Sequence, residues 1–259
     1  MLSFSANLTF LYTELPFLDR FAAAADDGFK AVEYLGPYDH AEEAVAEALS
    51  RNGLEQALFN VPSGDWDGGD RGIACLPDRI GEFRAGIPKA LDYAEALGCR
   101  RLNVLAGIAP QGADPQALEQ TFVDNLRFAA PLCAEKGVKL LIEPINTRDI
   151  PGFYLSTLTH AEHVLDAVGS DNLFIQFDFY HVQIMQGDLA ENFRRLKDRI
   201  AHVQVADNPG RNAPGTGEIN YPFIFADLER LGYDGWIGCE YKPGGPTSDS
   251  LGWMDAYRT

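Results

Sequence analysis

Four polar residues stand near the ends of four successive strand-like segments in the second half of the chain. The segments are KLLIEPIN (139–146), LFIQFDFYH (173–181), AHVQVAD (201–207) and WIGCEYK (236–242), and the polar residues are Glu143, Asp178, Gln204 and Glu240. Alternate residues of a strand point to opposite faces, and apolar residues such as Leu140 and Ile142 occupy one face of each segment. The polar side chains share the opposite face, where an unpaired carboxylate is costly enough that it is usually neutralised or bound to a cation.

This set of side chains predicts a metal site. Three carboxylates that lie close together cannot all stay ionised unless a cation lies between them. Three carboxylates and one amide are oxygen ligands, which favour Mg²⁺ or Mn²⁺ over zinc or copper. Taken singly, each residue could instead hydrogen-bond to a loop at the end of its strand. Their common position on successive strands favours the metal site.

The elements that must position these residues alternate regularly along the chain. Strand-like runs occur at 4–10, 31–35, 54–61 and 101–107 as well as in the segments above, and helical stretches such as 15–29, 41–53, 86–98 and 117–137 follow them. Eight such units predict one (β/α)₈ TIM barrel over residues 1–259, with the polar residues at the carboxyl-terminal mouth where barrel enzymes build their sites. An open doubly wound sheet is the alternative, but no G-x-G-x-x-G motif follows the first strand.

Composition excludes several classes of protein. Hydrophobic residues make up 46% of the chain and charged residues 23%, which is typical of a globular protein. A formal net charge of −17 at pH 7 repels phosphate backbones and anionic membranes, so we expect no nucleic-acid partner and no membrane. The four cysteines are scattered singly, and no basic, apolar leader begins the chain. These features predict reduced thiols and a cytoplasmic protein.

Longer motifs resemble those of the hydroxypyruvate isomerases, which are members of the xylose-isomerase-like barrel superfamily. The resemblance covers essentially the whole chain. It rests on FSANLTFLYTE (4–14), VEYLGPYD (32–39), NVPSGDWDGGDRGIACLPDR (60–79), IEPINTRDIPGF (142–153), FDFYHVQIMQGDL (177–189), VQVADNPGRNAPGTGEINY (203–221) and GWIGCEYKP (235–243). These motifs distinguish less well between the hydroxypyruvate isomerases and their near relatives, such as isomerases of longer 2-oxo acids.

The resemblance implies a particular chemistry. The metal site of the family falls on Glu143, Asp178, Gln204 and Glu240, and its acid/base pair falls on Glu143 and Glu240. The implied reaction interconverts hydroxypyruvate and tartronate semialdehyde through an enediolate, whose charge a divalent ion would hold. Related ketose 3-epimerases carry His where this chain has Gln204, and this difference favours the isomerase branch.

The implied substrate is a small 2-oxo acid or hydroxy-aldehyde, which needs binding residues in addition to the metal. His181, three residues after Asp178, could bind a substrate hydroxyl or orient a ligand, or could simply pack in the loop. Arg71 and Lys242 are candidates for binding the substrate carboxylate, and Arg148 and Arg211 are further candidates. Each of these four cations could also be a solvated surface charge. Trp66, in a long loop after the third strand, could close over the substrate.

Alternative functions remain open at this level. A 2-oxo-tetronate isomerase or a ketose 3-epimerase would use the same barrel. A barrel endonuclease would use several histidines and bind an acidic backbone, which the net charge disfavours. A non-catalytic barrel would keep the metal only for structure. Self-association is expected from the superfamily, with the loop at 11–16 as one candidate contact.

Overall fold

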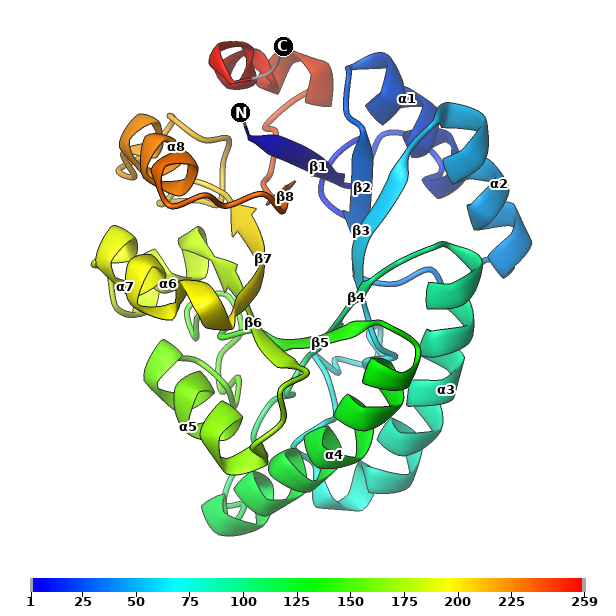
Figure 1. Cartoon of the computed structure of the whole chain (residues 1–259), viewed down its shortest axis with the longest axis vertical. Coiled ribbons are helices and arrows are strands. Elements are labelled where there is room, and N and C mark those ends of the chain that lie inside the picture. The colour runs from blue at the N-terminus through cyan, green and yellow to red at the C-terminus, as the bar shows by residue number, and fades with distance from the viewer. Residues whose placement is uncertain (1, 258–259) are drawn as a thin grey trace.

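Eight parallel strands close into a barrel in the computed structural model, which describes residues 2–257 (Figure 1). Residues 1, 258 and 259, the ends of the expected domain, lie outside the described residues. Each strand pairs with the next along the chain, and the last pairs with the first. The strands are β1 (Ser3–Asn7), β2 (Ala31–Tyr34), β3 (Glu55–Asn60), β4 (Arg101–Val104), β5 (Lys139–Ile142), β6 (Leu173–Asp178), β7 (Ile200–Val205) and β8 (Trp236–Cys239). The predicted TIM barrel is confirmed.

Helices surround the strands on the outside of the ring (Figure 1). They are α1 (Arg20–Asp26), α2 (Glu42–Asn52), α3 (Ile80–Ala96), α4 (Pro115–Glu135), α5 (Leu158–Val168), α6 (Phe179–Met185), α7 (Leu189–Leu196) and α8 (Tyr221–Arg230). α2 and α5 end at Gly53 and Gly169, whose φ values of 62° and 67° are left-handed and cost glycine little. None of the described helices is both long and apolar enough to cross a bilayer.

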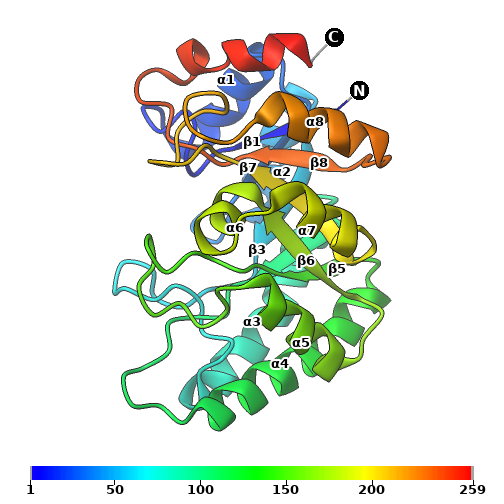
Figure 2. The same ribbon diagram turned by 90° about the vertical axis from the view of Figure 1, so that its left-hand side faces the viewer.

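The regular alternation departs from the prediction after β6 and β8. Two helices, α6 and α7, follow β6, whereas two 3₁₀ helices, Thr247–Ser250 and Gly252–Ala256, follow β8. The second of these packs Trp253 against Phe4 of β1, with ring centroids 5.3 Å apart, and against Phe225 of α8 at 5.7 Å. These 3₁₀ helices, red in Figure 2, take the place of an α-helix after β8 and lie next to β1 and α8.

The strands end earlier than predicted, and β6 gives the physical reason. The sequence pattern extends that strand to residue 181, but the strand stops at Asp178 and α6 begins at Phe179. The Asp178 carboxylate accepts a hydrogen bond from the backbone N–H of Tyr180 at 2.8 Å and caps the helix. The predicted strand is therefore wrong beyond Asp178, and His181 lies in the first turn of α6.

The two faces of each strand have different surroundings, as the period-two pattern predicts. Leu140 and Ile142 of β5 join the core between strands and helices. Leu141, on the inner face, packs with Leu58 and Ala201 in a separate apolar cluster inside the barrel. Closer to the carboxyl ends of the strands, the interior is polar, and its buried side chains include Ser5, Asn7, Glu33, Asn60, Asn103, Gln176 and His202. This polar layer lies directly beneath the candidate site.

Candidate active site

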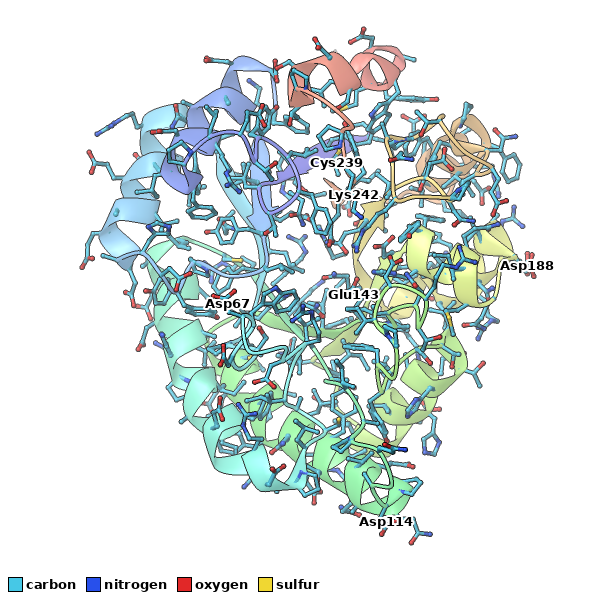
Figure 3. All side chains as sticks on the ribbon, turned by 180° about the vertical axis from the view of Figure 1, so that it is seen from behind. Asp67, Asp114, Glu143, Asp188, Cys239 and Lys242 are labelled. Carbon is cyan, nitrogen blue, oxygen red and sulfur yellow. The ribbon has the colours of Figure 1, made fainter. Side chains whose placement is uncertain are left out.

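The four polar residues of the sequence pattern come together at the carboxyl ends of neighbouring strands. Asp178 pairs in register with Gln204 across β6 and β7, while Glu143 and Glu240 follow β5 and β8 directly. Glu143, Gln204 and Glu240 line a cavity of about 90 Å³, and Asp178 is buried beside it at 1% exposure. Figure 3 shows Glu143 near the centre of the ring of strands, whereas Asp114 and Asp188 lie at its periphery. The cavity is walled by apolar side chains that include Phe10, Leu105, Ile145 and Ile150.

An arginine whose side chain is largely buried enters this group of carboxylates. Arg211 lines the cavity, and its Nη2 lies 2.7 Å from Glu240 Oε1 and 3.7 Å from Asp178 Oδ2. Its guanidinium group lies 4.5 Å from the ring centre of Phe10 and 5.4 Å from that of Tyr180. Cation–π contacts of this kind stabilise a desolvated cation. Arg211 therefore brings a permanent positive charge into a site that would otherwise be strongly negative.

The loop after β7 holds Arg211 in place. The Asp207 carboxylate accepts hydrogen bonds from the backbone N–H groups of Gly215, Gly217 and Ile219 at 2.8 to 3.0 Å. Arg211 itself has a φ of 59°, and its carbonyl oxygen accepts the backbone N–H of Lys242 at 2.7 Å. A φ in this region is uncommon for a residue other than glycine and persists only where the surroundings fix it. The hydrogen bonds of Asp207 and the backbone hydrogen bond from Lys242 therefore fix the loop that carries Arg211.

Burial and mutual repulsion perturb the carboxyl groups. The pKa of Glu143 is raised well above its ordinary value by burial and by the nearby charges of Glu240 and Asp178. Burial also raises the pKa of Glu240 to about 8, against the opposing effect of Arg211. Burial likewise raises the pKa of Asp178 to about 6. Carboxyl groups that titrate near neutral pH are suited to proton transfer.

His181 lines the same cavity and is held by neighbouring donors. Its Nδ1 lies 3.4 Å from the backbone nitrogen of Asn146 and 2.6 Å from the side-chain nitrogen of that residue. A backbone N–H can only donate, so Nδ1 accepts from Asn146, while Nε2 lies 3.5 Å from Arg211 Nη2, which is also a donor. Burial and Arg211 lower the pKa of His181 well below its usual value, which keeps the ring neutral. Nε2 lies 3.5 Å from Asp178 Oδ2 and 3.8 Å from Glu143 Oε1.

The donor atoms of the site fit a divalent cation. Glu143, Asp178 and His181 each offer a ligand atom within 4.8 Å of the others, and all three are buried. Asp178 Oδ2 is buried and has no hydrogen-bond partner among the described residues. A buried carboxylate oxygen without a partner is costly, and a cation would satisfy it. Gln204 adds an amide, with its Nε2 bound to Glu33 Oε1 at 2.7 Å.

The other cations considered from the sequence lie elsewhere. The Lys242 side chain is exposed and lines a separate surface hollow beside residues 212–216. In the sequence Lys242 has the same strand parity as Glu240, but β8 ends at Cys239 and the chain then turns, so this parity no longer places the Lys242 side chain. Arg71 packs on Trp66, 4.2 Å from the ring centre, and Trp66 in turn lines the cavity. Arg148 binds Asn208 at 3.2 Å and bridges two loops. Arg71 and Lys242 do not line the cavity, and their role in substrate binding stays a prediction.

Several polar residues of the site come from the first four strands and were not singled out from the sequence. Asn103 Nδ2 donates to Glu143 Oε2 and to Asn60 Oδ1, both at 3.1 Å. Glu33 binds Gln204, as described above. The period-two pattern applied to VEYL (32–35), FNV (59–61) and LNV (102–104) would have predicted inward-facing Glu33, Asn60 and Asn103.

This barrel, with its acidic mouth, has recognisable relatives. The family model described as xylose isomerase-like TIM barrel matches residues 21–257, and the chain belongs to this family.

The chain is 50% identical over 254 residues to the 2-oxo-tetronate isomerase of Cupriavidus necator, with 98% of each chain covered. It is 49% identical over 258 residues to the hydroxypyruvate isomerase of Escherichia coli, with 100% of each covered. The protein is an enzyme homologous to these isomerases, and the resemblance drawn from the sequence motifs is confirmed. A crystal structure from Brucella melitensis, described as an AP endonuclease of family 2, matches with a TM-score of 0.97 at 44% identity over the whole of both chains.

Proposed function

We propose that the protein interconverts hydroxypyruvate and 2-hydroxy-3-oxopropanoate by metal-assisted proton transfer through an enediolate. In this proposal Glu143, Asp178, Gln204 and Glu240 hold a divalent ion, Mg²⁺ or Mn²⁺, and Glu143 and Glu240 act as the acid/base pair. The observation that carries the proposal is the meeting of two buried glutamates with raised pKa values and a largely buried arginine in one small cavity. The homology to hydroxypyruvate isomerase supports the choice of reaction.

The metal would stabilise the negative charge that develops on the substrate oxygens during the reaction. A divalent cation held by these residues would polarise the substrate oxygens and lower the pKa of the carboxyl groups around it. The buried Asp178 Oδ2, which has no hydrogen-bond partner among the described residues, supports its presence. Oxygen donors favour Mg²⁺ or Mn²⁺.

Two glutamates provide the two proton transfers that the reaction needs. One removes a proton from the hydroxymethyl carbon, and the other protonates the former carbonyl carbon, while the hydroxyl proton moves from one oxygen to the other. Glu143 is held by Asn103, and Glu240 is held by Arg211, so the two groups have fixed and different surroundings. His181 Nε2 lies 3.8 Å from Glu143 Oε1 and 3.5 Å from Asp178 Oδ2, so in the tautomer that carries its proton on Nε2 it can donate to a substrate oxygen there. Which glutamate acts first depends on how the substrate lies.

Arg211 is the best candidate for binding the substrate carboxylate. Among the cavity-lining side chains within residues 2–257, it is the one that carries a permanent positive charge. An arginine fork can bind a carboxylate with two parallel hydrogen bonds. With a net charge of −17, the protein needs such a local cation to attract an anionic substrate.

The two near relatives leave the length of the substrate open between hydroxypyruvate and the longer 2-oxo-tetronate. The resemblance of the long sequence motifs to those of hydroxypyruvate isomerases supports the shorter acid in this proposal. A nucleic-acid substrate, which the description of the Brucella melitensis structure suggests, is disfavoured by the small cavity and the acidic surface. Self-association and a cytoplasmic location stay predictions from the sequence.

A proton NMR time course in D₂O tests the proposal. Hydroxypyruvate and 2-oxo-tetronate are each incubated with protein that has been treated with a chelator and then supplied with Mg²⁺, Mn²⁺ or no metal. We expect faster conversion of hydroxypyruvate, deuterium incorporation at carbon, and loss of activity without metal. Conversion without deuterium would contradict the enediolate route. Undiminished activity after chelation would contradict the role of the metal.

A further inference from the structure

A second buried carboxylate lies inside the barrel, below the proposed site, and has no part in the chemistry described above. Glu33 comes from β2 and is fully buried at 0% exposure. Its side chain reaches across the barrel interior to β7, where it contacts His202 and Gln204. A buried carboxylate is costly unless donors satisfy it. The role of Glu33 depends on which donors it binds and on which side chains these hydrogen bonds hold in place.

Four donors satisfy Glu33 completely. Oε2 accepts Ser5 Oγ at 2.8 Å and His202 Nε2 at 2.8 Å. Oε1 accepts Asn7 Nδ2 at 3.1 Å and Gln204 Nε2 at 2.7 Å. A carboxylate has about four acceptor positions, so none is left for another group. The carboxylate is therefore fixed in orientation by residues from β1 and β7.

The barrel wall leaves room for this carboxylate. A Cβ atom at Gly238 on β8 would lie 2.2 Å from Glu33 Oε1 and 2.4 Å from Oε2. Such a distance is far inside van der Waals contact, so a side chain at this position would displace the carboxylate. Gly238 pairs in register with Gln204. The fit of Glu33 thus depends on a glycine beside the residue that it binds.

The bond to Glu33 decides which end of the Gln204 amide faces the cavity. An ionised carboxylate can only accept, so the amide must turn its NH₂ group toward Glu33. Its oxygen then lies on the other side, where Oε1 accepts Gln176 Nε2 at 2.7 Å. Gln176 and Gln204 both line the cavity. A carbonyl oxygen has two lone pairs, so this one keeps a lone pair for a cation, whereas the reversed amide would offer only N–H groups.

We propose that Glu33 is a positioning residue that orients the Gln204 amide so that its oxygen, and not its nitrogen, is offered to the divalent ion. This inference rests on the proposed metal site. It extends that site to β2 and to a residue that touches neither metal nor substrate. Groups that orient metal ligands in this way typically change metal affinity about 10- to 100-fold when they are replaced.

The test measures Mn²⁺ binding directly, by electron paramagnetic resonance of free Mn²⁺ in titrations of chelator-treated protein. In Glu33→Gln, the amide at position 33 offers one acceptor oxygen and an NH₂ group, so Gln204 loses its fixed partner. We expect the Kd for Mn²⁺ to rise about 10- to 100-fold. In the exchange variant Glu33→Gln/Gln204→Glu, the amide at position 33 donates to the carboxylate at position 204. The hydrogen bond is thus restored in the opposite direction, and position 204 offers a carboxylate oxygen to the metal. We expect its Kd to return to within about tenfold of the wild-type value.

Ser5→Ala is the matched control, because it removes one donor from Oε2 and leaves the bond between Oε1 and Gln204 intact. We expect a lower melting temperature but a Kd for Mn²⁺ within about threefold of wild type, since the ligand orientation is kept. A general loss of barrel stability would weaken Mn²⁺ binding in Ser5→Ala as well, and the exchange variant would not repair it. A Glu33→Gln Kd within threefold of wild type, or an exchange variant that binds no better than Glu33→Gln, would overturn the inference.

Two further outcomes separate this inference from the proposed function. If Gln204→Ala binds Mn²⁺ as tightly as wild type, Gln204 is no ligand and the inference falls, while isomerase activity of the wild-type protein still supports the function. If Glu33→Gln does not fold, the exchange variant decides. A folded exchange variant with near wild-type Mn²⁺ affinity supports the role of Glu33, and one that is unfolded or binds no better than Gln204→Ala refutes it.

Discussion

Replacement of Arg211 by methionine should separate recognition of the substrate carboxylate from the chemical step. The guanidinium group is 12% exposed and lies 2.7 Å from Glu240 Oε1, so its charge is poorly screened. A charged hydrogen bond contributes about 1.5 to 3 kcal/mol. Loss of that contribution from substrate binding corresponds to a rise in KM of about 10- to 150-fold. Arg211→Lys keeps the positive charge but loses the two parallel N–H donors of the guanidinium group, so we expect an intermediate KM.

Steady-state kinetics with hydroxypyruvate, measured by NMR or by a coupled assay, give KM and kcat for each variant. Inhibition by neutral dihydroxyacetone is measured in parallel, because this analogue lacks the carboxylate. We expect Arg211→Met to lose affinity for the acid and to keep its affinity for the neutral analogue. Because Arg211 also lowers the pKa of Glu240, kcat is compared over a range of pH.

Arg148→Met is the matched control, since Arg148 lies in a neighbouring loop, binds Asn208 at 3.2 Å and does not line the cavity. We expect its KM to stay within about threefold of wild type, as for surface substitutions away from a site. The reasoning would be refuted by an Arg211→Met variant whose KM for hydroxypyruvate matches that of Arg148→Met. Equal losses of affinity for the acid and the neutral analogue would also refute it, because they would indicate a general distortion of the cavity.

Three further predictions concern the buried carboxylates. Glu143→Gln and Glu240→Gln should each lower kcat by about 10²-fold or more while circular dichroism shows a folded barrel; unchanged turnover in either variant would disprove the acid/base assignment. Burial raises the pKa of Glu240 from 4.5 to about 8, so the native metal-free protein keeps a proton that the unfolded chain has lost. Its free energy of unfolding should therefore fall as pH rises from 4.5 to about 8, by up to about 1.4 kcal/mol per pH unit, and Glu240→Gln should reduce the slope in urea titrations. A flat or rising profile would contradict this sign. Gly238→Ala should lower the free energy of unfolding by about 1 to 3 kcal/mol, because its Cβ would lie 2.2 Å from Glu33 Oε1. Gly245→Ala, whose Cβ would meet nothing within 4 Å, should change that free energy by less than about 0.5 kcal/mol, and equal effects of the two would argue against steric crowding.

Local sequence patterns were sufficient to predict the barrel and the residues at its mouth. A parallel strand buried on both faces must be apolar, so an inward glutamate such as Glu143 stands out from its neighbours. Period two then assigns Asp178 and Gln204 to the same inner face. These properties depend on residues next to one another in the chain. The sequence could therefore predict that these strand-end side chains lie together at one mouth of the barrel.

The tertiary structure decided the contacts that depend on where loops and strand ends turn. Lys242 shares strand parity with Glu240, yet the chain turns after Cys239 and leaves its side chain exposed. Arg211 reaches the carboxylates from a loop that gives no periodic signal. Glu33 binds Gln204 across the barrel, 171 positions away in the chain. Such contacts arise only when the barrel closes, because closure brings inner faces together that no local pattern relates.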